Sequence, residues 1–225
     1  MFQCGFVIFD NITQLDFTGP LQVLHRLPDS QIHIIGATID PVMSDCGLAL
    51  MPTITFADCP PLDLLCVPGG FGVEAAMADQ VLIEFVRTQA QQARYVTSVC
   101  TGAFVLGAAG LLKGKKATTH WAYHSLLALV EAIPTQGRVV RDGHIYTGGG
   151  VTAGIDFALS IVADIAGEQV AQRIQLAIEY DPAPPFNSGS PNQAAGDIVS
   201  NLAGFYATRN QVFGPAVQAA YQLLS

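Results

Sequence analysis

Residues 95–112 carry no charged side chain, and this run constrains the fold more than any other stretch of the chain. Its first part, up to Val99, is rich in β-branched and aromatic residues and predicts a buried strand. The part that follows contains Gly102, Gly107 and Gly110 among apolar residues at helical spacing, and predicts a helix. The run is nearly long enough to cross a bilayer, but its division into strand and helix indicates the centre of a protein core.

Cys100 lies at the junction between this strand and this helix. A strand that turns directly into a helix has the geometry of a nucleophile elbow, which exposes one side chain and aims it along the helix axis. The partial positive charge and unpaired N–H groups of a helix N-terminus favour an anion there. We therefore expect the Cys100 thiol to ionise more readily than an ordinary thiol, because the thiolate is the reactive form. The segment leaves open the alternative that Cys100 is a small hydrophobic core residue.

The composition predicts one α/β domain with a sizeable core. The chain has 225 residues, of which 50% are hydrophobic and 12% charged. We expect residues 1–180 to form the core, followed by an irregular segment and a helical tail over 181–225. The net charge is −8 and the ten Lys and Arg residues are scattered, so nucleic acids and anionic membranes are poor partners.

The five cysteines are odd in number and none has CxxC spacing, so the sequence predicts neither a disulfide framework nor a zinc site. The N-terminal residues 1–10 lack a basic region and resemble a strand rather than a secretory signal. We therefore expect a cytoplasmic protein with reduced thiols.

Apolar strands alternate with helices along the chain, which predicts a mainly parallel sheet sandwiched by helices, with a flavodoxin-like fold. Pro20 is expected near the start of a helix that begins at Thr18. The expected strands are 3–9, 31–36, 62–67, 95–99 and 116–119, with hairpins over 41–51 and 139–147. The other expected helices are 79–93, 121–129, 152–166 and 168–179, one directly after Cys100, and one from Ala194 onward.

Three turns follow strands of this sheet, and they carry Asp16, Gly69-Gly70 and Cys100. Because sites in such sheets form at the carboxyl ends of the strands, we expect these residues to share one pocket. Asp16 lies between apolar neighbours, which raise the pKa of a carboxyl group by removing solvent from its charged form. It could then donate a proton near neutral pH. The alternative is that Asp16 caps the following helix.

The amides of Gly69 and Gly70, together with that of Thr101, could stabilise a developing negative charge as an oxyanion hole does. The alternative is a tight turn that requires glycine. His120 follows a strand on the same edge and is the best candidate for a base, although a structural role is favoured for a histidine beside a tryptophan. Asp156, in an apolar helix, is expected to be a buried structural carboxylate.

Several of these segments together resemble the ThiJ/PfpI superfamily, which has the class I glutamine amidotransferase-like fold. The resemblance implies that fold over residues 1–180 and a homodimer. The segments that carry it are 15–20 (LDFTGP), 67–70 (VPGG), 98–103 (SVCTGA), 117–121 (ATTHW) and 148–156 (GGGVTAGID).

Within the superfamily, Asp16 with the residues after it, the Cys-Thr-Gly elbow and residues 180–187 (YDPAPPFN) resemble enzymes that hydrate isonitriles, R–NC, to N-formamides. The resemblance implies that Cys100 attacks the terminal carbon while the nitrogen gains a proton, which gives a covalent thioimidate that water hydrolyses. Asp16 would be the general acid and base, and Thr101 would orient the sulfur or Asp16. Neither a metal nor an organic cofactor is required. Thr101 stands where protease-like members carry histidine, which weakens a peptidase interpretation.

Two other functions remain open at this point. Regulators of the AraC type share the Thr-His-Trp and Gly-rich segments, so a stand-alone ligand- or redox-sensing domain is one alternative. Their DNA-binding half is basic, whereas residues 194–225 hold one Arg and one Asp, so we do not expect DNA binding. Glyoxalase or deglycase chemistry on α-oxoaldehydes, which other superfamily members perform with a similar thiolate and carboxyl pair, is the second alternative.

Overall fold

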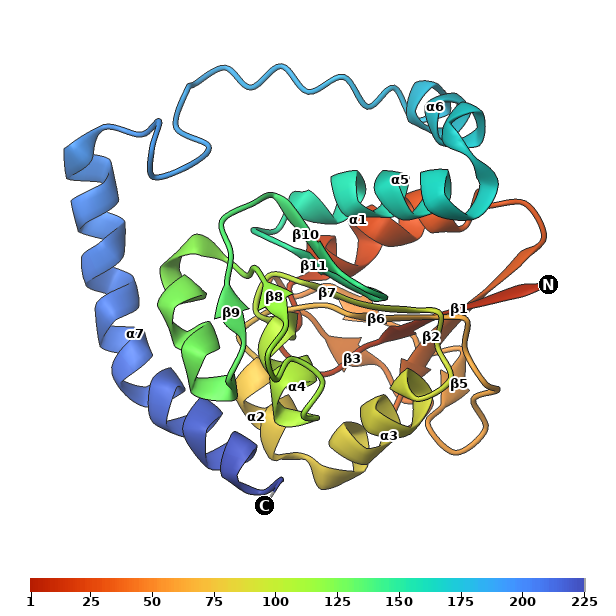
Figure 1. The fold of residues 1–225 in the computed structure, drawn as a ribbon, viewed down its shortest axis with the longest axis horizontal. Helices are drawn as coiled ribbons and strands as arrows, with labels where there is room; N and C mark the ends of the chain where they lie inside the picture. Colours follow the sequence, from red (N-terminus) through yellow and green to blue (C-terminus); the bar gives the residue numbers. More distant parts are fainter. Residues whose placement is uncertain (225) are drawn as a thin grey trace.

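A seven-stranded sheet runs through the middle of the computed structural model, which describes residues 1–224 (Figure 1). Its strand order is β10-β11-β7-β6-β1-β2-β5, and every neighbouring pair is parallel except β10 and β11. The predicted mainly parallel sheet is therefore confirmed. The strands of this sheet are β1 (Phe2–Val7), β2 (Ser30–Gly36), β5 (Ile54–Thr55), β6 (Leu64–Val67), β7 (Tyr95–Val99), β10 (Val139–Asp142) and β11 (Ile145–Gly148).

Helices cover both faces of the sheet, as Figure 1 shows. One face carries α1 (Gln14–Leu24), α5 (Ala153–Ala166) and α6 (Glu168–Ala177). The other carries α2 (Val73–Ala78), α3 (Gln80–Ala90), α4 (Gly102–Ala108), the 3₁₀ helix η1 (Trp121–Val130) and the long C-terminal α7 (Gly196–Gln222). Two small sheets complete the fold: the hairpin β3 (Val42–Met43) with β4 (Ala49–Leu50), and β8 (Lys116–Ala117) with β9 (Ile133–Pro134).

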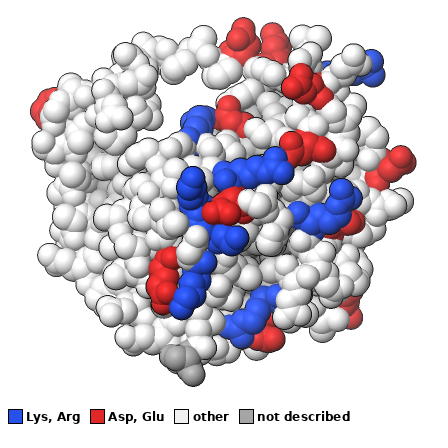
Figure 2. All heavy atoms as spheres, viewed as in Figure 1, with Lys and Arg blue, Asp and Glu red and all other residues white. Residues whose placement is uncertain are grey.

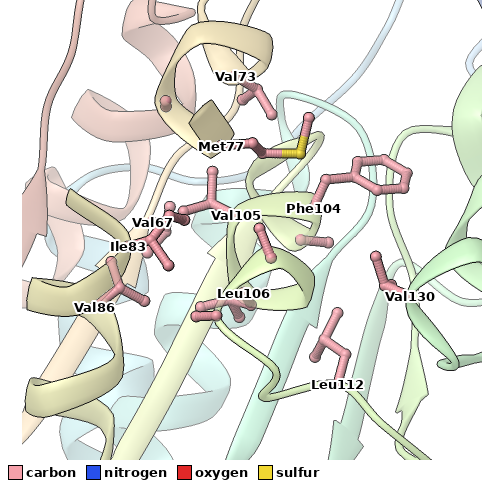
Figure 3. Packing of buried hydrophobic residues seen from close by; sticks show 14 of the residues in the cluster. Val67, Val73, Met77, Ile83, Val86, Phe104, Val105, Leu106, Leu112 and Val130 are labelled. Atoms are coloured by element: carbon pink, nitrogen blue, oxygen red, sulfur yellow. The ribbon is translucent and has the colours of Figure 1, made fainter. Parts of the chain in front are cut away.

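Each face of the sheet has its own hydrophobic core, because successive strand residues point to opposite faces. In β6, Leu65 and Val67 join the core under α2 to α4, whereas Leu64 and Cys66 join the core under α1 and α5. All four side chains are fully buried, which explains why this strand is continuously apolar. Figure 3 shows the first core, in which Phe104, Val105 and Leu106 of α4 lie among side chains of α2, α3 and η1.

Helix α1 begins four residues earlier than the sequence predicts, at Gln14 rather than Thr18. Pro20 therefore lies inside the helix instead of near its start. It has no N–H to donate to the carbonyl of Asp16, four residues before it. Its ring packs against α5 at Gly154, where an added Cβ would lie 2.8 Å from Pro20 Cδ. Tertiary packing thus offsets the cost of a proline within the helix.

Most other elements match their predicted positions, including both hairpins and the strand-turn-helix at Cys100. Three short elements were not predicted, the strands β5 and β9 and the helix α2, since each is too brief for a periodic pattern to develop. The helix expected over 121–129 is present as the 3₁₀ helix η1.

Charged side chains of both signs alternate across the face shown in Figure 2, and the side where Figure 1 places α7 is almost free of charge. Five basic residues pair with carboxylates at 2.6–3.5 Å: Arg87, Lys113, Lys115, Arg138 and Arg141. This face therefore offers no continuous basic surface. None of the helices over residues 1–224 combines the length and the hydropathy needed to cross a membrane.

Candidate active site

The strand order places three loops side by side at the carboxyl edge of the sheet. Because β6 lies between β1 and β7, the loop after β6 contacts both the loop after β1 and the turn after β7. An isolated bridge joins Ile12 to Gly70. Gly70 has φ +133°, and an added Cβ would lie 2.3 Å from the amide nitrogen of Thr13. Only glycine permits so close an approach. The prediction that these turns meet at one edge of the sheet is therefore confirmed.

Cys100 occupies a strained elbow. Its φ is +54°, a left-handed conformation that costs a non-glycine residue about 1–3 kcal/mol. Three hydrogen bonds hold it: its amide donates to the carbonyl oxygens of Gly148 (3.1 Å) and Gly149 (2.9 Å), and its carbonyl accepts from Oγ1 of Thr119 (2.6 Å). Gly102 completes the turn, because a Cβ there would lie 2.1 Å from the carbonyl oxygen of Val67. The sequence therefore predicted the elbow correctly.

Asp16 is fully buried in the first turn of α1. Its Oδ2 accepts a 3.0 Å hydrogen bond from the amide of Gly69, and its Oδ1 makes no hydrogen bond. The carboxyl group interacts with the Cys100 thiol closely enough for each to shift the other's pKa. The residue that caps α1 is Thr13, so the alternative in which Asp16 is a helix cap is wrong.

Burial raises the pKa of Asp16 to about 7, because a carboxylate in this site loses its hydration. The Gly69 amide and the Cys100 thiol act in the opposite direction, and the negative charge of Asp45 raises the pKa further. The prediction that Asp16 can hold a proton near neutral pH is therefore confirmed.

The prediction for Cys100 is wrong, since its pKa is raised well above the ordinary value for a thiol rather than lowered. Burial is the main cause, because only 6% of the residue is exposed, and the charge of Asp16 adds to it. The amide and hydroxyl of Thr101 act in the opposite direction by hydrogen bonding to the sulfur, but they do not outweigh the loss of solvent. The helix N-terminus alone did not reveal how completely the sulfur is enclosed.

The predicted oxyanion hole at Gly69 and Gly70 is also wrong. The Gly69 amide donates to Asp16, and the Gly70 amide donates to Oγ1 of Thr101 at 3.0 Å. Both donors are therefore engaged within the protein. Thr101 links the two loops instead, because its hydroxyl also lies 3.3 Å from the Gly70 carbonyl oxygen and contacts Cys100.

A cavity of about 210 Å³ opens above the sulfur of Cys100. Asp16 and Gly69 do not line it, so the prediction that both share one pocket with Gly70 and Cys100 is wrong. Asp16 is fully buried and interacts with the Cys100 thiol instead. The residues that line the cavity are Thr13, Asp45, Gly70, Phe71, Cys100, Thr101, His120, Tyr123, Val151 and Tyr206.

His120 lines this cavity but forms no hydrogen bond with Cys100. Its Nδ1 accepts a 3.3 Å hydrogen bond from the amide of Ala122, so its Nε2 carries the hydrogen of the neutral ring. Burial lowers the pKa of His120, which keeps the ring neutral. The rings of Trp121, Tyr123 and Tyr206 pack around it. The structural role favoured from the sequence fits this arrangement better than a base does.

Sequence reasoning missed the contribution of the C-terminal helix to this cavity. Tyr206 of α7 lines it, and Arg209 lies behind its wall, with its guanidinium 4.2 Å from the ring centroid of Phe71. Arg209 also forms a hydrogen bond with Tyr123. The only signal in the sequence was that Arg209 is the one basic residue after position 194.

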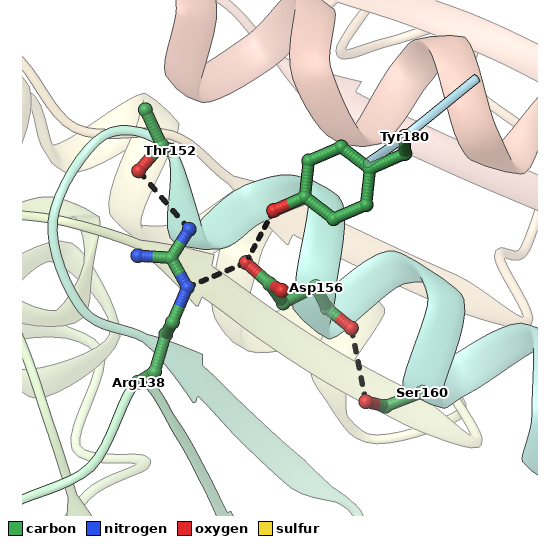
Figure 4. A network of polar contacts seen from close by, with 5 residues as sticks. All are labelled: Arg138, Thr152, Asp156, Ser160 and Tyr180. Carbon is green, nitrogen blue, oxygen red and sulfur yellow. Dashed lines mark hydrogen bonds and ion pairs between the residues drawn. The ribbon is translucent and has the colours of Figure 1, made fainter. Parts of the chain in front are cut away.

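Asp156 is hydrogen-bonded but not buried, which corrects one half of the expectation for it. Figure 4 shows its Oδ2 between Nε of Arg138 at 2.6 Å and the hydroxyl of Tyr180 at 3.1 Å. Its side chain is 33% exposed. Arg138 also donates to Oγ1 of Thr152 at the start of α5. The network ties the end of α6 to α5 and does not reach Cys100.

No group of three or more His, Cys, Asp or Glu side chains within residues 1–224 is arranged to hold a metal ion. The site holds a cysteine in a strained elbow, next to a buried carboxyl group. Its place at the carboxyl edge of a flavodoxin-like sheet defines the class of α/β protein to which the chain belongs. The DJ-1/PfpI family matches residues 4–164, and the chain belongs to that family.

The chain is also similar to two curated proteins and to one solved structure. The isonitrile hydratase of Pseudomonas putida is 58% identical over 197 residues, which are 88% of this chain and 86% of that protein. The crystal structure of a ThiJ/PfpI family protein from Pseudomonas syringae is 42% identical and has a TM-score of 0.92, over 97% of this chain and 90% of that one. The HTH-type transcriptional regulator GbdR of Pseudomonas aeruginosa is 28% identical over 79% of this chain, which spans 50% of that regulator.

Proposed function

We propose that this protein is a lyase that hydrates isonitriles, R–NC, to N-formamides, with Cys100 as the nucleophile. The observation that carries the proposal is the buried Asp16–Cys100 pair beneath the cavity, in a chain 58% identical to isonitrile hydratase over most of its length. A soft sulfur nucleophile suits the terminal isonitrile carbon, and a carboxyl group whose pKa is about 7 suits proton transfer at neutral pH.

In the first half of the reaction, the S–H group of Cys100 adds to the isonitrile carbon. Asp16 accepts the thiol proton as the sulfur attacks, which supplies thiolate only when substrate is present. The sulfur lone pair forms the C–S bond, and the proton passes from Asp16 to the lone pair of the same carbon. The product is a neutral thioimidate, R–N=CH–S–Cys100. Electron counting thus places the first proton on carbon, and not on nitrogen as the sequence analysis expected.

In the second half, water adds to the thioimidate carbon, and the nitrogen takes up a proton. The resulting adduct, R–NH–CH(OH)–S–Cys100, loses its hydroxyl proton as the C=O bond forms and the C–S bond breaks. The sulfur regains a proton and the N-formamide leaves. One water is consumed, and the residues described above require no metal and no organic cofactor for these steps.

Thr101 orients the sulfur in this scheme. Its amide and hydroxyl contact Cys100, and its bonds to Gly70 fix its own position. His120 presents its Nε2 hydrogen as a donor at the cavity wall rather than acting as a base.

The raised pKa of Cys100 favours an enzyme over a redox sensor. Oxidation of a sensor cysteine follows its thiolate content and its exposure, and Cys100 has little of either in the free protein. A thiol that ionises only through a neighbouring carboxylate suits a substrate-dependent reaction.

The test is incubation of the purified chain with a simple alkyl or aryl isonitrile, with formamide detected by proton NMR. Stoichiometric formation of the N-formamide is the expected result, and Cys100→Ala is the matched control. No formamide from any of several alkyl and aryl isonitriles would overturn the proposal.

We further propose that the protein works as a cytoplasmic homodimer. The apolar and nearly uncharged surface of α7 supports an interface between copies, since Leu202, Phe205 and Val212 are 46%, 59% and 61% exposed. Light scattering tests this, because a dimer has twice the 23.8 kDa mass of the chain.

A further inference from the structure

The second half of the proposed reaction needs a group that can take a proton from water inside the cavity. Asp16 is badly placed for this, because it is fully buried and does not line the cavity. Once the sulfur carries the thioimidate, the substrate itself fills the space above it. A different group at the cavity wall must therefore hold the attacking water.

Only a few of the cavity residues can accept a proton. Tyr123 and Tyr206 are protonated phenols whose pKa burial raises further. His120 already accepts the Ala122 amide at Nδ1, so its Nε2 carries a hydrogen and can only donate. Among the described residues that line the cavity, Asp45 is the one carboxylate.

The structure holds Asp45 firmly against the cavity. It lies in the turn of the β3–β4 hairpin, and its amide donates a 2.9 Å hydrogen bond to the carbonyl of Ile12. Its Oδ2 accepts a 2.5 Å hydrogen bond from Oγ1 of Thr13, which leaves Oδ1 to accept from a water molecule. Ile12 is in turn bridged to Gly70, next to the Cys100 elbow. The carboxylate is thus fixed to the same backbone frame as the nucleophile.

We propose that Asp45 is the catalytic base of the second half-reaction, so that the two carboxyl groups divide the chemistry between them. Asp45 takes one proton from the water as the water oxygen bonds to the thioimidate carbon. The C=N π electrons move to nitrogen, and Asp45 delivers that proton to it. Asp16 serves only the sulfur, on the forward addition and on its release. This division rests on the proposed isonitrile hydration.

The negative charge of Asp45 also assists the first half. It raises the pKa of Asp16, so that Asp16 can hold the thiol proton until the carbon receives it. The two groups therefore act in sequence: Asp45 makes Asp16 a stronger base for the thiol proton while the C–S bond forms, and acts on water afterwards.

The test is the intact mass of Asp45→Asn and Asp16→Asn after mixing with an isonitrile. Asparagine at position 45 still accepts the Thr13 hydrogen bond but cannot take a proton. We expect Asp45→Asn to accumulate an adduct on Cys100 equal to the mass of the isonitrile, with one equivalent consumed rapidly and kcat reduced about 10²–10⁴-fold. Asp16→Asn should form no adduct. The matched control is Asp40→Asn, an exposed carboxylate near the same hairpin that does not line this cavity.

A second variant separates catalysis from structure. Asp45→Ala with added formate should regain part of its turnover and lose its adduct, because a small carboxylate can occupy the vacated space. Wild-type turnover in Asp45→Asn, or slow turnover with no adduct and no formate rescue in Asp45→Ala, would overturn the role of Asp45. A wild-type chain that makes no formamide and no adduct would instead overturn the proposed function itself.

Discussion

The amide of Gly69 donates a 3.0 Å hydrogen bond to Oδ2 of Asp16, 53 positions earlier in the chain. This one contact holds the carboxyl group where it interacts with the Cys100 thiol, while Oδ1 makes no hydrogen bond. A buried carboxyl group with only one of its two oxygens hydrogen-bonded favours its protonated form, which is the physical origin of its raised pKa. The fold thus places a carboxyl group that can hold a proton near neutral pH beside a thiol that does not ionise readily by itself.

Replacing Cys100 with alanine should abolish formamide production, with a loss of at least about 10³-fold in kcat/KM, because no other nucleophile lines the cavity at that place. Folding should change little, since the side chain is small and the strained φ of +54° is common to both residues. The unfolding free energy in urea should differ by less than about 2 kcal/mol. Full activity in the variant would refute the role of Cys100.

Asp16→Ala should lose activity to nearly the same extent and still fold. Asp16→Asn, which keeps an acceptor for the Gly69 amide, isolates the effect of charge on stability. The pKa of Asp16 rises from 3.8 to about 7 on folding. The stabilisation that protonated Asp16 adds to the unfolding free energy of the wild type is therefore fully present below pH 4 and is lost as the pH rises towards 7.

Relative to wild type, Asp16→Asn should therefore gain roughly 4 kcal/mol in unfolding free energy between pH 4 and pH 8, since one pKa unit is worth about 1.4 kcal/mol. Urea titrations of both proteins at several pH values give this difference directly. A constant difference across the range would show that Asp16 ionises as an ordinary surface carboxylate.

The rate of the first half-reaction should rise through about pH 7, because a protonated Asp16 cannot accept the thiol proton. The apparent pKa belongs to the Asp16–Cys100 pair rather than to one residue. A profile of kcat/KM for an isonitrile against pH measures it. Activity that rises only above pH 9 would indicate that the thiol ionises without help from Asp16.

Gly102→Ala should destabilise the fold by at least about 2 kcal/mol, because its Cβ would lie 2.1 Å from the Val67 carbonyl oxygen in a packed turn. Gly204→Ala in α7 is the control, since nothing lies within 4 Å of its added Cβ. That change should leave stability equal or slightly higher, as alanine favours a helix. Thermal melts of the two variants compare them, and equal stability would contradict the tight turn.

Tyr206→Ala should raise KM for isonitriles about 10-fold with a smaller effect on kcat, because it removes an aromatic wall of the cavity but no group that forms a bond or moves a proton in the proposed steps. Asn201→Ala, at an exposed position of the same helix that does not line the cavity, is the control and should behave as wild type. An unchanged KM in Tyr206→Ala would show that α7 plays no part in substrate binding.

The sequence by itself determined the layered α/β fold, the elbow at Cys100 and the edge of the sheet on which Asp16, Gly69 and Gly70 meet. Local patterns suffice for these features, since a buried parallel strand must be apolar and the left-handed or crowded turns at Gly70 and Gly102 require glycine. The start of α1 was misjudged, because packing of Pro20 against Gly154 overrides a local rule about proline.

Only the tertiary structure decided how the site is enclosed and which groups face its cavity. The raised pKa of Cys100 depends on burial by several elements at once, and the amides of Gly69 and Gly70 are engaged by Asp16 and Thr101 from distant segments. Tyr206, more than a hundred residues after Cys100, reaches the cavity because α7 packs along η1. Solvation and long-range contacts are properties of the assembled chain, so no local pattern of residues encodes them.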